Sequence, residues 1–381
     1  MTIRTLILSG GGGRGAFHAG VYKYLCQTEK PGVDTDHQGA WQPDIIVGTS
    51  IGAVNGAAIA QGLSGDELVD FWLSLREHDV EGIPPGMRAL SRWVANLIYK
   101  HMLGVRLPTV PPEIATSPPA SESWPPLPLL PAWLSERLIG RWNNLLDTGP
   151  LRQTVLTRLG ITDEKLAASP ITLLISATNV YTGELTIFSN RDIISRKTGL
   201  LREDVYTGIT VNRIIASCSI PLLYPWTKDT DGEVYWDGAV VANTPLGPAL
   251  DAVRDRPIDE PMEIVVVLMT PWWEKGEQPP ARRRTLPRDF GEAMTWTLDW
   301  ALLASFRTRL KLTRAYNERA AQEIAEGRIE RRYRFVKDVI VAPRDFLPVA
   351  RIIDYDEEAS RDLIALGYRA AEHAFRRHFG A

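Results

Sequence analysis

Two short apolar runs within the first sixty residues limit most strongly what this chain can fold into. The runs are residues 5–8 and 45–47; each leads into glycine, and segments with helical character follow at 15–27 and 53–60. A buried strand, a glycine-containing turn and a helix, twice in succession, is the alternation of a parallel sheet with helices on its faces. The pattern predicts an α/β fold.

The same alternation resumes after residue 170 and continues towards the C-terminus. Apolar runs predict buried strands, and segments with helical spacing lie between or after them. The expected strands are 171–177, 264–269 and 333–341, and the expected helices include 211–216, 289–326 and 357–379. No internal repeat is visible.

Residues 84–150 break this rhythm. They contain runs such as VPPEIATSPPASESWPPLPLLPAW, which favour polyproline-like or irregular chain. We interpret this segment as an insertion with amphipathic helices over 87–103 and 133–146. Its tryptophans could enter a lipid interface or, alternatively, pack the insertion onto the sheet. They include Trp93, Trp124, Trp133 and Trp142.

Composition excludes several classes of protein. A net charge of -3 and a pI near 6.1 argue against a nucleic-acid binder. Two distant cysteines, Cys26 and Cys218, form neither a disulfide framework nor a zinc site. The apolar run at 264–269 is too short to span a membrane, and the N-terminus lacks the long apolar core of a signal peptide. We therefore expect a cytoplasmic protein.

The sequence IVGTSIGAVNG places Ser50 between Gly48 and Gly52 at a strand-to-helix junction. Glycines on both sides remove the Cβ clashes that would block a sharp turn, so the hydroxyl can project as a nucleophile. The amides of the following helix favour negative charge at that point. The alternative is a tight turn in which Ser50 is only a helix N-cap.

The second segment with chemical potential is a glycine loop after the first predicted strand. It consists of Gly10, Gly11, Gly12, Gly13, Arg14 and Gly15. Its N–H groups could bind a phosphate or an oxyanion at a helix start. The loop also contains G-x-G-x-x-G, but Asp34 and Asp36, at the distance of a ribose-binding acid, have no strand pattern ahead of them. The pattern therefore lacks the acidic residue that a nucleotide site would place at the end of a second strand.

The third segment is Asp237 followed by Gly238 and Ala239, after a short apolar run. Alone, this pattern is typical of a turn. An exposed serine, however, needs a base, and a histidine late in the chain would have to be His373 or His378 in the C-terminal amphipathic helix. A pair of Ser50 and Asp237 fits better. The glycine loop must then supply much of the transition-state stabilisation.

The ordered set GGGGRG, GTSIGA and DGA resembles the patatin-like phospholipases. Further matches lie at 147–151, 177–184, 216–221 and 243–245, so the resemblance covers residues 6–245. It implies a three-layer α/β/α sandwich with a mainly parallel sheet. The Pro-rich helical insertion and the helical C-terminal extension depart from the minimal family pattern. We therefore expect a catalytic domain over 1–270, with the insertion at about 84–150, and a helical extension over 271–381 packed on the same domain.

The resemblance also implies the chemistry. Ser50 is the nucleophile, Asp237 the general base, and Gly10 to Gly15 the oxyanion loop with Arg14 as its basic residue. The implied activity is hydrolysis of acyl esters in lipids without a cofactor or metal. We expect the protein to meet lipid at a peripheral interface and to bind no nucleic acid. A protein or small ligand could act as its activator. The alternatives are a soluble carboxylesterase or thioesterase with the same dyad, and a non-catalytic patatin-like interaction protein.

Overall fold

The computed structural model describes residues 2–82, 144, 146–194, 198–202, 204–274, 286–287, 290–347, 349–352 and 355–380. The helices expected at 87–103 and 133–146 lie almost entirely outside these residues, as do the four tryptophans of the predicted insertion.

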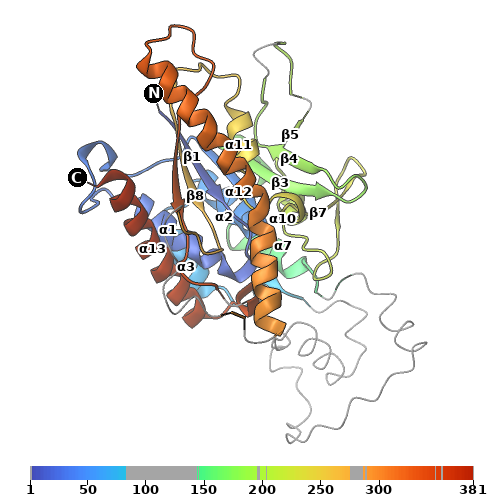
Figure 1. The fold of residues 1–381 in the computed structure, drawn as a ribbon. Coiled ribbons are helices and arrows are strands. Elements are labelled where there is room, and N and C mark those ends of the chain that lie inside the picture. Colours follow the sequence, from blue (N-terminus) through green and yellow to red (C-terminus); the bar gives the residue numbers. More distant parts are fainter. Residues whose placement is uncertain are drawn as a thin grey trace, which may run out of the picture.

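One sheet runs through the described part of the chain, and most of its neighbouring strands are parallel (Figure 1). Its strands are β1 (Ile3–Leu8), β2 (Ile45–Thr49), β3 (Thr172–Asn179), β4 (Leu185–Ser189), β5 (Val205–Thr207), β6 (Thr227–Lys228), β7 (Val234–Asp237), β8 (Met262–Val267) and β9 (Val336–Val341). The order is β5-β4-β3-β2-β1-β8-β9, with β7 paired to β3 and β6 to β7. The run from β3 to β9 is parallel throughout, whereas β4 and β7 are antiparallel to β3.

Helices cover both faces of this sheet. They are α1 (Ala16–Leu25), α2 (Ile51–Ala60), α3 (Gly65–Ser74), α4 (Glu77–Val80), α7 (Gly149–Thr157), α8 (Asp163–Ala167), α9 (Val211–Ser217), α10 (Ala239–Ala242), α11 (Leu246–Ala252), α12 (Phe290–Ala325) and α13 (Glu357–Phe379). Short 3₁₀ turns include η1 (Gly12–Gly15) and η5 (Val349–Ile352).

Alternating side chains of the strands divide the core into two layers. Leu6 and Leu8 of β1 pack into a cluster with α1, α2, α3, α9 and α13, whereas Ile3 and Ile7 pack into a second cluster with α11 and α12. Figure 1 shows α12 crossing one face and α1, α3 and α13 together beyond the sheet. The predicted three-layer α/β/α sandwich is confirmed.

The C-terminal region contributes a strand as well as helices. β9 pairs in parallel with β8 over six residues, so the sheet continues beyond residue 271. α13 packs closely on α1: a Cβ added at Gly20 would lie 1.9 Å from the Ile364 carbonyl oxygen, and one at Gly367 would lie 2.1 Å from that of Phe17. These glycines let the two helix backbones approach each other.

None of the described helices is long and apolar enough to cross a membrane.

Candidate active site

Ser50 stands at the end of β2 in a strained conformation. Its φ of 56° and ψ of -128° place it, unlike most non-glycine residues, at positive φ. A Cβ at Gly52 would lie 2.2 Å from the Leu8 carbonyl oxygen, and one at Gly48 would lie 2.4 Å from that of Gly52. Only glycine fits at either position, so the sequence G-T-S-I-G is what permits this sharp turn.

The backbone of Ser50 is held from a segment far away in the sequence. Its N–H donates to Ser217 Oγ at 2.8 Å, and Ser217 Oγ donates to the Ser176 carbonyl oxygen at 2.7 Å. Ser217 ends α9 and Ser176 lies in β3. Ser217 belongs to the stretch at 216–221 that carries part of the family resemblance, so the segment could be recognised from sequence. Its contact with Ser50 could not.

The glycine loop lies directly against the serine, because β1 and β2 are parallel neighbours and their carboxyl ends meet at one edge. A Cβ at Gly10 would lie 3.0 Å from Ser50 Cβ and 2.5 Å from Asn243 Oδ1. The Gly10 N–H donates to the Asn243 carbonyl oxygen at 3.2 Å. Within the described residues, the N–H groups of Gly11, Gly12 and Gly13 donate no hydrogen bond.

Asp237 reaches the same edge from β7. β7 is antiparallel to β3, with Asp237 opposite Ala177, while the preceding residue of β3, Ser176, is opposite Thr49 of β2. β3 therefore brings Asp237 close to the turn at Ser50. A Cβ at Gly238 would lie 2.5 Å from Ser176 Oγ, so the chain after Asp237 also requires glycine.

The Asp237 carboxyl group is desolvated. Its Oδ1 accepts the Ala239 N–H at 2.8 Å, and its Oδ2 is buried without a hydrogen-bond partner among the described residues. Burial raises the pKa of Asp237 to about 7, although the Ala239 N–H and the Ser50 hydroxyl act in the opposite direction. The Ser50 hydroxyl therefore lies close enough to the Asp237 carboxyl group to lower its pKa, although the two groups form no well-aligned hydrogen bond.

The Arg14 guanidinium is bound by residues of the C-terminal region. Its Nη1 contacts Asp299 Oδ1 of α12 at 3.1 Å, and its Nη2 donates to the Leu347 carbonyl oxygen at 2.8 Å. Arg14 therefore belongs to the loop by its backbone, while its side chain is bound elsewhere. Neither Asp299 nor Leu347 lies in a motif, and no sequence signal pointed to them.

The described histidines contact neither Ser50 nor Asp237 through a hydrogen bond. His18, on α1, is fully buried, and burial lowers its pKa to about 3. His373, on α13, contacts Arg344 at 2.8 Å. Within the described residues, moreover, no group of three His, Cys, Asp or Glu side chains could hold a metal ion.

A network of buried side chains joins the nucleophile helix to the end of the glycine loop. Asn55 Nδ2 donates to the Gly15 carbonyl oxygen at 3.0 Å and lies 3.2 Å from His18 Nδ1. Trp72 Nε1 donates to Asn55 Oδ1 at 3.0 Å. Asn55 therefore links α2, η1 and α3 behind the site.

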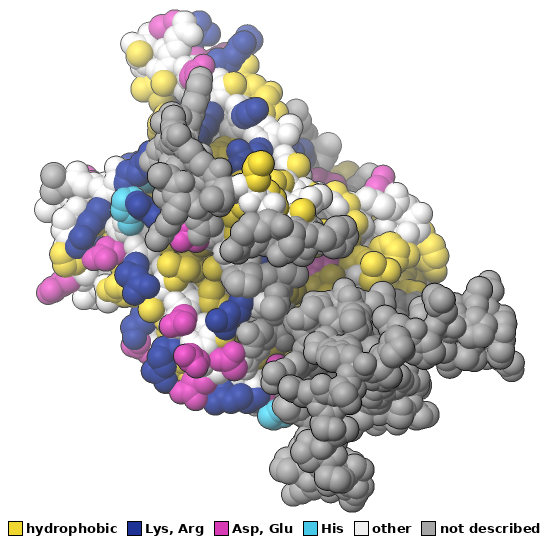
Figure 2. All heavy atoms as spheres, turned by 60° about the horizontal axis from the view of Figure 1, so that its bottom comes forward, with side chains coloured by type: hydrophobic (Ala, Val, Ile, Leu, Met, Phe, Trp, Pro, Cys, Tyr) yellow, Lys and Arg dark blue, Asp and Glu magenta, His cyan; other side chains and the backbone are white. Residues whose placement is uncertain are grey.

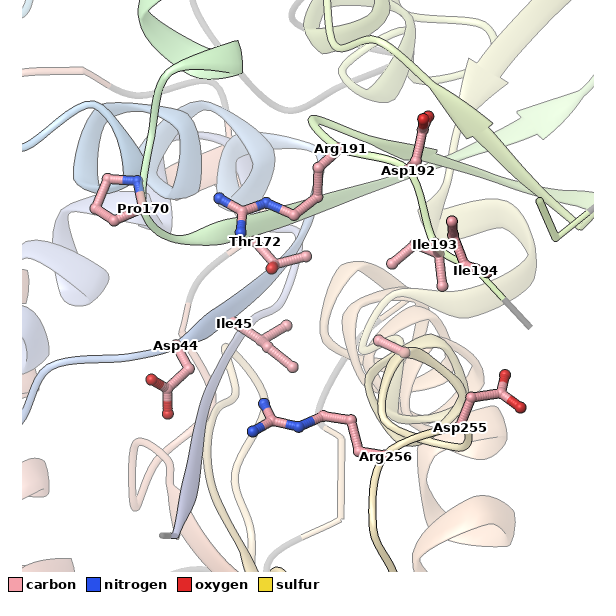
Figure 3. Close-up of a pocket in the computed structure, with 11 residues that line it drawn as sticks. Asp44, Ile45, Pro170, Thr172, Arg191, Asp192, Ile193, Ile194, Asp255 and Arg256 are labelled. Atoms are coloured by element: carbon pink, nitrogen blue, oxygen red, sulfur yellow. The ribbon is translucent and has the colours of Figure 1, made fainter. Parts of the chain in front are cut away.

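A pocket of about 370 Å³ lies at the opposite end of the strands (Figure 3). Ile45 and Thr172, which begin β2 and β3, line it together with Arg191 and Arg256. Ser50 follows the other end of β2, roughly 16 Å away at about 3.3 Å per residue. This pocket is therefore not where an ester would meet the serine.

An α/β/α sandwich with a strained serine, a glycine loop and a buried carboxyl at one strand edge has the elements of an ester hydrolase. A family model described as patatin-like phospholipase matches residues 6–250, well over half of the chain. The chain belongs to this family. It is therefore a hydrolase of ester bonds and, in general terms, a lipolytic acyl hydrolase.

Solved structures resemble the chain only distantly. VipD from Legionella pneumophila is 12% identical, with 99% of this chain and 67% of that chain covered and a TM-score of 0.37. The ExoU–SpcU complex of the Pseudomonas aeruginosa type III secretion system gives 17% identity, 81% and 51% coverage and a TM-score of 0.25. The chain thus spans about half of that second chain. No curated protein matches the sequence.

Proposed function

We propose that this chain is a serine acyl hydrolase of the phospholipase A or lysophospholipase type, with Ser50 as nucleophile and Asp237 as general base. One observation carries the proposal. Ser50, strained at φ 56°, lies against Gly10 of the glycine loop and near a buried carboxyl whose Oδ2 has no partner among the described residues. A nucleophile, a base and N–H donors therefore meet at one point.

The reaction follows from these groups. Asp237 accepts the proton of Ser50 as Oγ bonds to the ester carbonyl carbon, and the carbonyl electron pair moves to oxygen. When the tetrahedral intermediate collapses, the carbon–oxygen bond to the alcohol breaks and Asp237 returns the proton to the departing oxygen. Water then attacks the acyl-enzyme in the same way and releases the fatty acid. A pKa of about 7 makes Asp237 a stronger base than an ordinary carboxylate.

The oxyanion would be stabilised by the loop from Gly10 to Gly15. The N–H groups of Gly11, Gly12 and Gly13, which donate to no described group, are the donors we assign to it. The N-terminal end of α2, at Ile51, adds a favourable dipole. Removal of one such donor typically lowers the rate by about 100- to 1000-fold.

A lipid substrate is supported by apolar side chains exposed close to Asp237 in sequence. Val240 and Val241 lie on α10, and Leu222 and Trp226 follow Ser219, whose carbonyl accepts the Asp237 N–H. Figure 2 shows apolar side chains at the surface of one face, with basic and acidic side chains interspersed. We propose a peripheral lipid interface that relies on apolar contact rather than on charge.

The test compares two substrates and two variants. Fatty-acid release is measured from mixed phospholipid vesicles and from a short soluble ester, with wild type, Ser50→Ala and Asp237→Asn. Release from vesicles that both substitutions abolish is the expected result. Cleavage of the soluble ester alone would instead identify a carboxylesterase or thioesterase. No Ser50-dependent turnover on either substrate would contradict the proposal and would favour a non-catalytic interaction protein.

A further inference from the structure

We propose that Asp299, on α12, is a positioning residue that holds the glycine loop in its working conformation through Arg14. This inference rests on the proposed function, because it assigns the loop a role in catalysis. Asp299 lies beyond residue 250, where the family match ends. The residue would therefore be a feature of this chain's C-terminal region rather than of the motifs that define the family.

The loop has only one side chain by which it can be held. Residues 10–15 are five glycines and Arg14. Glycine backbones lose the most conformational freedom on folding, so a loop of this composition needs anchoring from outside. The Arg14 N–H donates to the Gly11 carbonyl oxygen at 3.2 Å, which ties the position of Arg14 directly to the N–H groups assigned to the oxyanion.

That one side chain is bound deep in the C-terminal region. Arg14 Nη1 lies 3.1 Å from Asp299 Oδ1, and the two side chains are only 2% and 3% exposed. Nη2 donates to the Leu347 carbonyl oxygen at 2.8 Å. Breaking a buried ion pair by removing one partner is strongly unfavourable, because the remaining charge stays buried. Asp299 thus fixes the guanidinium, and the guanidinium fixes the loop.

Two further contacts bring the same region against the site. A Cβ at Gly12, where φ is 56°, would lie 2.1 Å from the Ile352 carbonyl oxygen of η5. α12 also packs on α10, which begins two residues after Asp237. The C-terminal region therefore lies against both the loop and the chain that follows the base, and Asp299 supplies its charged contact.

The experiment uses the full chain and a control at a second ion pair of the same helix, in which Arg314 of α12 binds Asp338 of β9. Asp299→Asn keeps the shape of the side chain and removes its charge. Asp299→Glu keeps the charge and moves it by one methylene. Asp338→Asn removes a charge from the pair that Asp338 forms with Arg314 of α12 at 2.6 Å, away from the loop. We expect Asp299→Asn to lower kcat about 10- to 100-fold with KM within twofold, Asp299→Glu to lower it less, and Asp338→Asn to leave it unchanged.

A second measurement does not depend on turnover. Hydrogen exchange of peptides covering residues 9–15 is compared in the Ser50→Ala background with and without Asp299→Asn. Faster exchange in that segment, with none from Asp338→Asn, is expected. Unchanged kcat and exchange would overturn the proposal, as would equal losses from Asp299→Asn and Asp338→Asn. If wild type shows no Ser50-dependent turnover, the proposed function fails, and the exchange comparison still decides whether Asp299 holds the loop.

Discussion

The buried carboxyl of Asp237 gives the reaction a predictable dependence on pH. It must be ionised to accept the proton of Ser50, and burial raises its pKa to about 7. We therefore expect kcat/KM for a short soluble ester to rise about tenfold per pH unit below pH 7 and to level off above it. A pH–rate profile from pH 5 to 9 measures this. An inflection near pH 4 would show that the carboxyl is solvated in the working enzyme.

The same group should lower the stability of the folded protein at alkaline pH. Its folded pKa lies above the unfolded value of 3.8, so the folded state binds more protons and loses stability as pH rises towards 7. Asp237→Asn should therefore increase the free energy of unfolding at pH 8 by about 2 to 4 kcal/mol and change it little below pH 4. Urea denaturation of both proteins at pH 8 and pH 4 is the measurement. A difference that is the same at both pH values would exclude the carboxyl as its source.

At the scale of residues, the sequence predicts groups that belong to motifs and misses those that act through the fold. Ser50, Asp237 and the glycine loop could be proposed because fixed spacings demand glycine around them. The contacts of Ser217 and Asp299 could not be predicted, because each residue meets its partner only through the tertiary structure. For Asp299 the partner, Arg14, lies 285 positions away.

A substitution at the junction between β2 and α2 tests why glycine flanks the nucleophile. A Cβ at Gly52 would lie 2.2 Å from the Leu8 carbonyl oxygen, which is backbone and cannot move aside cheaply. Gly52→Ala should therefore destabilise the fold by about 2 kcal/mol or more and reduce turnover over 100-fold. Thermal unfolding and ester hydrolysis measure both effects.

Gly56→Ala is the matched control, because it lies on the same helix one turn further on. Its nearest contact would be a side-chain methyl, Ile46 Cγ2, at 3.0 Å. Alanine also gains up to about 1 kcal/mol of helix propensity over glycine. We expect Gly56→Ala to change stability by less than about 1 kcal/mol and to keep turnover. Similar losses in both variants would show that α2 tolerates no substitution, and would contradict a specific steric requirement for glycine at position 52.

A substitution of Asn55 tests whether its hydrogen bonds hold α2, the glycine loop and α3 together. Asn55→Asp keeps the shape but cannot donate to the Gly15 carbonyl oxygen, and it buries a carboxyl beside His18. We expect a loss of about 1 to 3 kcal/mol in stability, measured by urea denaturation. Asn212→Asp, on the more exposed side of α9, is the comparison and should cost less. Equal losses would argue against the network.

Elements were predicted well where apolar periodicity is strong. The predicted helix 357–379 coincides with α13, and the predicted strand 45–47 lies inside β2. Short strands such as β5 and β6 were not predicted, because two or three residues carry no periodic signal. The close packing of α1 on α13 at Gly20 and Gly367 was not predicted either, since a glycine inside a helix pattern does not indicate which helix packs against it.

At the scale of the molecule, the alternation of strands and helices predicted the layers but not the order of the strands. β8, which comes late in the chain, lies beside β1 with β9 beyond it, and β7 returns to pair with β3. Both placements decide the site. The first puts the C-terminal region next to the glycine loop, and the second brings Asp237 to Ser50. We retain as a proposal the division into a catalytic domain over 1–270 and an extension over 271–381 packed on it.

A chain shortened to residues 1–270 tests whether that extension is separable. The deletion removes β9, which pairs with β8 along its whole length, together with α12 and α13. Four buried side chains of α13, Leu363, Ile364, Phe375 and Phe379, belong to the core cluster that also contains α1. At about 1.5 to 3 kcal/mol each, their burial is comparable with the whole stability of a typical domain, about 5 to 15 kcal/mol. We therefore expect the shortened chain to show no cooperative unfolding transition in a circular-dichroism melt. Co-expression with residues 271–381 should restore a cooperative unfolding transition. A cooperative melt and full Ser50-dependent turnover from residues 1–270 alone would mean that the glycine loop holds its shape without Arg14's partners, and the assignment of Asp299 would fall with the argument for an inseparable extension.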